Sequence, residues 1–122
     1  MTSLAIAGIS IHVVDVSRGV VAQGMRVEVF GAGAVRKPLC DGIINAKGVL
    51  DEAVLMGEAM QAGCYEAVFH AAAYYRAAAV ALPALPFIDV VTYRFAIADT
   101  RQHYHLPMKL TPWGYSCFRG GA

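Results

Sequence analysis

Histidine is the residue type in this chain best suited to chemistry at neutral pH, and its spacing is informative. His12 lies in an alternating segment, residues 9–15, on the less apolar of the two faces. His103 and His105 lie two residues apart in a second segment, residues 103–110, and therefore share a face of a strand. An imidazole can accept a proton from water or donate one to a leaving nitrogen. An outward histidine on a strand is also often only solvated or buried in an interface, so both interpretations stay open at this point.

Other groups near these histidines offer further chemistry. His103 and His105 are compatible with half of a zinc site, but no Cys or carboxylate at ligand spacing completes it, so we predict no functional metal. Cys117 is a candidate nucleophile, although a buried structural cysteine is the commoner case. Lys109 shares the face of His105, and His70 is expected in the core or in an interface. The opposite face of this segment is apolar and carries Tyr104, Leu106, Met108 and Leu110.

The elements that must position these side chains are short strands separated by turn residues. A short helix is expected over the alanine-rich residues 72–79, because Pro83 and Pro86 prevent a longer one. Residues 51–61 are ambiguous between a helix and a loop with one short strand. Turn signals roughly every 8–15 residues predict an all-β antiparallel sandwich, in a single domain over residues 1–122. The predicted strands are residues 9–15, 25–30, 39–45, 64–71, 88–97, 103–110 and 115–119.

The composition favours an oligomer over a solvated monomer. The chain is 57% hydrophobic and 16% charged, whereas about 45–50% and about 25% are typical. No uninterrupted apolar run reaches the ~18 residues of a membrane span, and residues 1–14 lack the basic start of a signal peptide. We therefore expect no membrane association, a cytoplasmic location and a buried subunit interface. A net charge of +1 argues against nucleic acid as a partner, and three cysteines without a C-x-x-C pair favour reduced thiols.

Several stretches together resemble one known family, the transthyretin-related 5-hydroxyisourate hydrolases. The likeness runs nearly from end to end. It rests on Ile11-His12-Val13-Val14-Asp15 with Arg18-Gly19, Gly63-Cys64-Tyr65-Glu66 with Val68-Phe69-His70, Leu82-Pro83 with Pro86-Phe87-Ile88-Asp89-Val90-Val91, His103-Tyr104-His105-Leu106-Pro107, and Thr111-Pro112-Trp113-Gly114-Tyr115-Ser116. The last two stretches are the most specific.

The resemblance implies a transthyretin-like (prealbumin-like) sandwich of seven to eight strands. It also implies a homotetramer with its sites in a channel where dimers meet. Members of the family hydrolyse a strained cyclic ureide that forms when urate is oxidised in purine catabolism. In that reaction water attacks a ring carbonyl and the ring opens, so the resemblance implies a small-molecule substrate and no cofactor.

The resemblance also assigns roles to individual residues. His12 and His105 match catalytic positions of the family, where they would activate the water and stabilise charge on the attacked carbonyl. Arg119 and Gly120 match the closing tetrapeptide of the family, usually Tyr-Arg-Gly-Ser, and together with Gly121 they would shape the floor of the substrate pocket.

The chain departs from the family pattern at two places in the site. It ends Phe118-Arg119-Gly120-Gly121-Ala122, so the usual phenol and the terminal serine hydroxyl are missing. Where the family usually has Asn-x-Asp-Gly-Arg, this chain has Asn45-Ala46-Lys47-Gly48-Val49. Val49 thus replaces an arginine that would bind substrate oxygens, and losing such a contact costs about 1.5–3 kcal/mol, or roughly ten- to a hundredfold in affinity.

Three hypotheses follow for the function. The first is a hydrolase redirected to a substituted ring, for example an N-alkylated one, in which Val49 and Phe118 place apolar surface in the substrate pocket. Lys109, where the family usually has leucine, would then add a cation. Because the four residues from His105 to Lys109 span ~13 Å of strand, this cation would serve the site of a neighbouring subunit. A solvated surface lysine is nearly as common. The second is a transthyretin-like binding protein with weak or no catalysis. The third is an ordinary hydrolase that tolerates the changes. Retention of both histidines favours hydrolysis.

Overall fold

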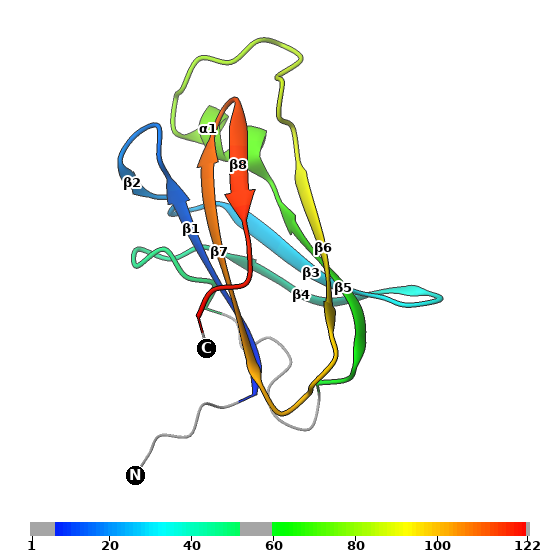
Figure 1. The fold of residues 1–122 in the computed structure, drawn as a ribbon. Helices are drawn as coiled ribbons and strands as arrows, with labels where there is room; N and C mark the ends of the chain where they lie inside the picture. The colour runs from blue at the N-terminus through cyan, green and yellow to red at the C-terminus, as the bar shows by residue number, and fades with distance from the viewer. Residues whose placement is uncertain (1–6, 52–59, 122) are drawn as a thin grey trace.

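The structure, a computed structural model, describes residues 7–51 and 60–121. These residues form two four-stranded sheets, in the orders β2-β1-β7-β8 and β4-β3-β5-β6, packed as a sandwich with one short helix (Figure 1). The predicted all-β sandwich is confirmed. The elements are β1 (Gly8–Asp15), β2 (Val20–Val21), β3 (Arg26–Ala32), β4 (Arg36–Ile43), β5 (Gly63–Phe69), α1 (Ala71–Ala77), β6 (Val91–Ile97), β7 (His103–Thr111) and β8 (Gly114–Cys117).

One pairing differs from a purely antiparallel sandwich. β1 and β7 run parallel, in a register that extends from Gly8 opposite His103 to Asp15 opposite Leu110. Most of the chain separates these two strands, so no hairpin has to join them and a parallel ladder is possible. The first sheet is therefore mixed, and it brings the strand of His12 beside the strand of His103 and His105.

Some element boundaries differ from the sequence-based ones for identifiable reasons. β6 begins at Val91, not at residue 88, because the segment before it packs on α1, where the Asp89 carbonyl accepts a hydrogen bond of 2.9 Å from the Ala72 N–H. β4 spans residues 36–43, and beyond it the side chain of Asn45 organises a turn. Most of the ambiguous segment 51–61 lies outside the described residues.

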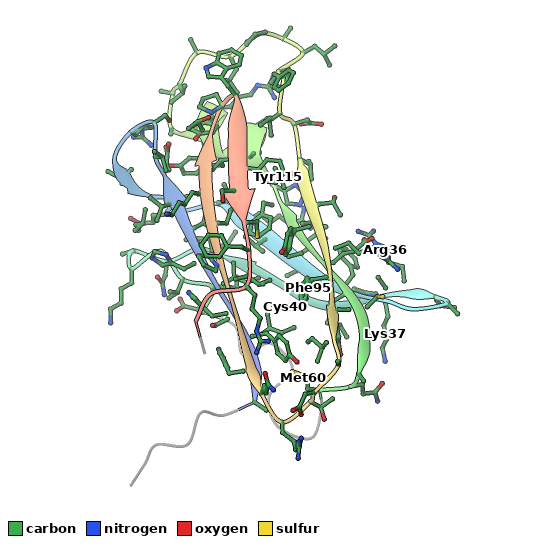
Figure 2. The ribbon with its side chains drawn as sticks, in the orientation of Figure 1. Arg36, Lys37, Cys40, Met60, Phe95 and Tyr115 are labelled. Atoms are coloured by element: carbon green, nitrogen blue, oxygen red, sulfur yellow. The ribbon has the colours of Figure 1, made fainter. Side chains whose placement is uncertain are left out.

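The core fills the space between the two sheets. Alternate side chains of β1 and β7 point inward, as predicted, and the second sheet contributes facing side chains, so that removal of apolar surface from water holds the layers together. The most buried members include Ile11, Val13, Leu106, Met108 and Leu110 from the first sheet and Val27, Val29 and Phe69 from the second. Figure 2 shows Arg36 and Lys37 projecting from the β3–β4 hairpin, away from β1 and β7.

A buried carboxylate ties the end of β1 to α1. Asp15 is fully buried, and its oxygens accept hydrogen bonds from the hydroxyl groups of Tyr74 (2.8 Å), Tyr75 (2.9 Å) and Ser17 (2.6 Å). Burial acts to raise the pKa of Asp15, but these hydrogen bonds and the Arg18 N–H outweigh it and lower the pKa below its ordinary value. The ionised carboxylate therefore stabilises this end of the sandwich.

Within the described residues, no helix has the length and apolar character needed to cross a bilayer.

Candidate active site

His12 lies in the middle of β1, on the face turned away from the core. The turn at residues 45–49 packs against it: the Gly48 carbonyl accepts a hydrogen bond of 2.8 Å from the Val13 N–H, and Val49 forms a β-bridge with His12. A Cβ atom at Gly48 would lie only 2.8 Å from Nε2 of His12, and its φ of +86° is in the left-handed region. Glycine is therefore needed here for the turn to approach the imidazole.

Asn45 builds this turn through its side chain. Its Oδ1 accepts hydrogen bonds from the backbone N–H groups of Lys47 (2.8 Å) and Val49 (3.2 Å), an arrangement typical of asparagine at turns. This turn places the Val49 side chain, half-buried, next to β1.

His105 lies on β7, beside β1, on the same outward face as His12. Ser10 is its direct neighbour across the parallel ladder, and the Ser10 hydroxyl lies 2.7 Å from Nδ1 of His105. Burial, and then the nearby charges of His12 and His103, lower the pKa of His105 below its ordinary value of 6.5. Its imidazole is therefore neutral at neutral pH and able to accept a proton.

The C-terminal segment returns across the first sheet and covers His105. The β7–β8 hairpin is closed by Thr111, whose hydroxyl accepts hydrogen bonds from the N–H groups of Trp113 (3.1 Å) and Gly114 (3.0 Å). The chain then crosses in front of β7 (red in Figure 1), where the Gly120 N–H donates to the His105 carbonyl at 2.7 Å. A Cβ atom at Gly120 would lie 2.9 Å from Cδ2 of His105, so this contact also needs glycine.

The structure thus brings together His12, His105, Val49 and Gly120, and it places Arg119 elsewhere. One guanidinium nitrogen of Arg119 donates to Oε1 of Gln102 at 2.6 Å, and the guanidinium carbon lies 4.1 Å from the centre of the Tyr104 ring. This side chain is engaged at the start of β7, next to a residue whose ring belongs to the core face.

The other predicted site residues surround the histidines more loosely. Lys109 is exposed on the outward face of β7, opposite Val14 on β1 and Ser116 on β8. Phe118 and Gly121 are exposed in the C-terminal segment, with Phe118 at 42% exposure and nothing within 4 Å of a Cβ placed at Gly121. Side chains at these positions are free to meet a ligand or a neighbouring subunit.

Two other candidates lie apart from the histidine pair. Burial raises the pKa of the Cys117 thiol to about 11, so it stays protonated, and this supports the structural interpretation over the nucleophilic one. His70 lies just beyond β5 in the other sheet and contacts Oε1 of Glu28 at 2.7 Å. Among the described residues, no three His, Cys, Asp or Glu side chains are grouped to bind a metal ion.

Sequence reasoning missed two features of this site, Ser10 and the close approach of Gly48. Ser10 precedes His12 by two residues on the same face, and this alternation was the available signal for it. The approach of Gly48 to His12 had no such signal, because it depends on where the turn meets β1 in space.

A model described as the HIUase/Transthyretin family matches residues 9–120. The chain belongs to the HIUase/Transthyretin family. Among members of the HIUase/Transthyretin family, the 5-hydroxyisourate hydrolase of Deinococcus radiodurans is 40% identical over 114 residues, which cover 93% of this chain and 95% of the relative.

The similarity of the fold to solved structures supports the assignment to the HIUase/Transthyretin family. The 5-hydroxyisourate hydrolase of Klebsiella pneumoniae matches with a TM-score of 0.77 and 26% identity, covering 96% of this chain and all of that one. The crystal structure of (S)-allantoin synthase matches with a TM-score of 0.89 and 28% identity over 99% of this chain. This chain spans only 46% of that protein.

Proposed function

We propose that this protein hydrolyses 5-hydroxyisourate or a closely related cyclic ureide in the breakdown of urate. The observation that carries the proposal is the placement of His12 and His105 on adjacent strands and on one outward face, with the pKa of His105 lowered by its surroundings. The names of the relatives support the same reaction.

From their positions we assign the two imidazoles different roles in the reaction. A neutral His105 takes a proton from water as the water oxygen bonds to a ring carbonyl carbon. His12 donates a hydrogen bond to the oxygen that becomes negative in the transition state. The proton on His105 then passes to the ring nitrogen as the C–N bond breaks. The net change is addition of one water across that bond, giving a carboxylic acid and an N–H.

Residues of the C-terminal segment and the 45–49 turn would bind the substrate. In this proposal Gly120 and Gly121 form the pocket floor with their backbone, and Phe118, Arg119 and Lys109 contribute from its rim or from a neighbouring subunit. The engagement of Arg119 with Gln102 means that its guanidinium would have to leave that partner to meet a ligand directly.

A second candidate substrate class is favoured by Val49. Its half-buried side chain forms a β-bridge with His12 where an arginine is usual, so the wall of the site is apolar at that point. An N-alkylated ring would bury its alkyl group there, and a buried arginine without a partner would disfavour it. We therefore include substituted ureides among the substrates to be tested.

The experiment compares wild-type protein with His12→Ala and His105→Ala, following ring opening of 5-hydroxyisourate by ultraviolet absorbance above the uncatalysed rate. Each substitution is expected to lower kcat/KM by about a hundredfold or more. His70→Ala, which removes an imidazole from the other sheet, is the matched control and is expected to keep wild-type activity.

Two results would contradict the proposal. Unchanged hydrolysis in both His12→Ala and His105→Ala would remove the histidines from the mechanism. Saturable binding of ureides by wild-type protein without turnover of any of them would instead indicate a binding protein of transthyretin type.

Exposed apolar side chains on the edge strands of the first sheet also support a homotetramer with sites at the interface between dimers. Several large apolar side chains are exposed in β2, in the β7–β8 hairpin and just beyond β8, namely Val20 (45%), Trp113 (64%), Tyr115 (52%) and Phe118 (42%). Burying them in an assembly removes this surface from water. Light scattering is expected to give about four times the 13.0 kDa chain mass. A single domain over residues 1–122 and a cytoplasmic location stay predictions.

A further inference from the structure

Ser10 lies between two histidine rings on the outward face of the first sheet. Its Oγ is 2.7 Å from Nδ1 of His105 and 2.7 Å from Nε2 of His103. The parallel pairing of β1 with β7 creates this arrangement, because Ser10 is directly opposite His105 and one pleat from His103. The three side chains form a continuous hydrogen-bonded chain.

The hydrogen count of this chain allows two arrangements. A serine hydroxyl has one hydrogen, so it donates to one ring and accepts from the other. If Ser10 donates to His103, then Nδ1 of His105 carries a proton and its Nε2 has a free lone pair. If Ser10 donates to His105, then Nε2 of His105 carries the proton and cannot act as a base.

The orientation of the His105 ring is restrained from two sides. Ser10 holds Nδ1, and the backbone of Gly120 covers the Cδ2 edge, where a Cβ would come within 2.9 Å. Turning the ring over would take Nδ1 away from Ser10. Because Nδ1 is engaged, Nε2 is the nitrogen left to face a substrate, and the identity of its tautomer decides whether His105 can act as a base.

We propose that Ser10 is a positioning residue that keeps the proton of neutral His105 on Nδ1 and its basic lone pair on Nε2. In this arrangement His105 donates to Ser10, and Ser10 donates to Nε2 of His103, which thereby sets the direction of the chain. The inference rests on the proposed hydrolase function, in which His105 takes a proton from water. Ser10 itself does not touch the substrate.

The decisive experiment measures the tautomer directly. In protein labelled with ¹⁵N-histidine at pH values where His105 is neutral, we expect a protonated, pyrrole-type Nδ1 and an unprotonated, pyridine-type Nε2 for His105. Ser10→Ala removes the acceptor, so both His105 nitrogens should move toward intermediate shifts. Ser10→Thr keeps a hydroxyl, is well accommodated in a strand, and should restore the wild-type pattern.

Kinetics provide the second measurement. Ser10→Ala is expected to lower kcat about tenfold, the effect of one ordinary hydrogen bond, with KM changed less than twofold because no substrate contact is lost. Ser10→Thr should recover most of the activity. His103→Leu removes the acceptor that orients the hydroxyl, and should shift the His105 tautomer in the same direction as Ser10→Ala. Ser116→Ala, an exposed serine on the same sheet, is the control.

The outcomes separate this inference from the proposed function. A proton on Nε2 of His105 in wild-type protein overturns the inference, whatever the activity. Wild-type ¹⁵N shifts and wild-type kcat in folded Ser10→Ala also overturn it. Absence of hydrolysis by wild-type protein contradicts the proposed function alone, since the tautomer is then still measured by the ¹⁵N shifts.

Discussion

Replacing Gly120 with alanine tests whether the C-terminal segment holds His105 in place. The new Cβ would lie 2.9 Å from Cδ2 of His105 and 3.2 Å from both Cγ and Cδ of Pro107. Carbon atoms pack at about 3.5–4.0 Å, so the groups must separate by roughly half an ångström. The backbone of Gly120 is not left-handed, so alanine adds no conformational strain of its own.

The structure limits how this clash is relieved. Pro107 is part of β7 and its ring is rigid, so either the His105 ring rotates or the C-terminal segment moves away. The second route weakens the hydrogen bond of 2.7 Å from the Gly120 N–H to the His105 carbonyl. A misplacement of 1 Å costs up to about a hundredfold in rate, so half that displacement predicts a fall of about tenfold in kcat/KM.

The assay is ring opening of 5-hydroxyisourate by Gly120→Ala beside Gly33→Ala. Gly33 is the matched control because it is exposed in the β3–β4 hairpin, and an added Cβ there meets nothing within 4 Å. Urea unfolding of both variants should stay within about 1 kcal/mol of wild type, since neither glycine lies in the core. Equal kcat/KM for folded Gly120→Ala and wild type would refute the idea that this contact positions His105.

Three further predictions follow from the same structure. Asp15→Asn removes a buried carboxylate that accepts several hydrogen bonds, so urea unfolding at pH 7 should show a loss of about 2–4 kcal/mol. Because the pKa of Asp15 is lowered on folding, its contribution is present above the ordinary value of 3.8 and disappears as pH falls; a variant that keeps its full deficit at pH 2 would contradict this. Val49→Arg with Gly121→Ser should raise kcat/KM for 5-hydroxyisourate and lower it for N-alkylated analogues, and equal effects on both would argue against a redirected pocket. Gly48→Ala should lose activity and stability beyond Gly24→Ala, because both have left-handed backbones but only at Gly48 would an added Cβ clash, with Val21 (2.7 Å) and with His12 (2.8 Å); matching losses would mean that backbone strain alone is responsible.

The local pattern of the sequence predicted faces and elements well. Alternation in residues 9–15 and 103–110 identified Ile11 and Leu106 as core residues and His12 and His105 as outward ones, because side chains two apart share a face of a strand. The two-residue strand β2 was not predicted, because a segment of two residues, Val20 and Val21, is too short to show a period. The pairing of the strands was not predicted either, because periodicity indicates which face of a strand is buried but not which strand lies beside it.

The parallel pairing of β1 and β7 could therefore not be predicted from the periodicity of the sequence, and the site depends on this pairing. It places Ser10 opposite His105, a contact between residues more than ninety positions apart. The family resemblance pointed to His12 and His105, whereas the contacts of Ser10 with His105 and His103 follow only from the strand register.

The departures from the family pattern lie beside the atoms that position the histidines, not on them. The turn is fixed by the Gly48 carbonyl and the Asn45 side chain, and the C-terminal segment by the Gly120 N–H. None of these atoms depends on which side chain occupies position 49 or 121. Replacing an arginine by Val49 and a serine by Gly121 therefore changes what the pocket offers a substrate while the two imidazoles stay in place. This separation is why reverting those side chains should alter substrate preference, whereas substituting Gly48 or Gly120 should weaken catalysis on every ring.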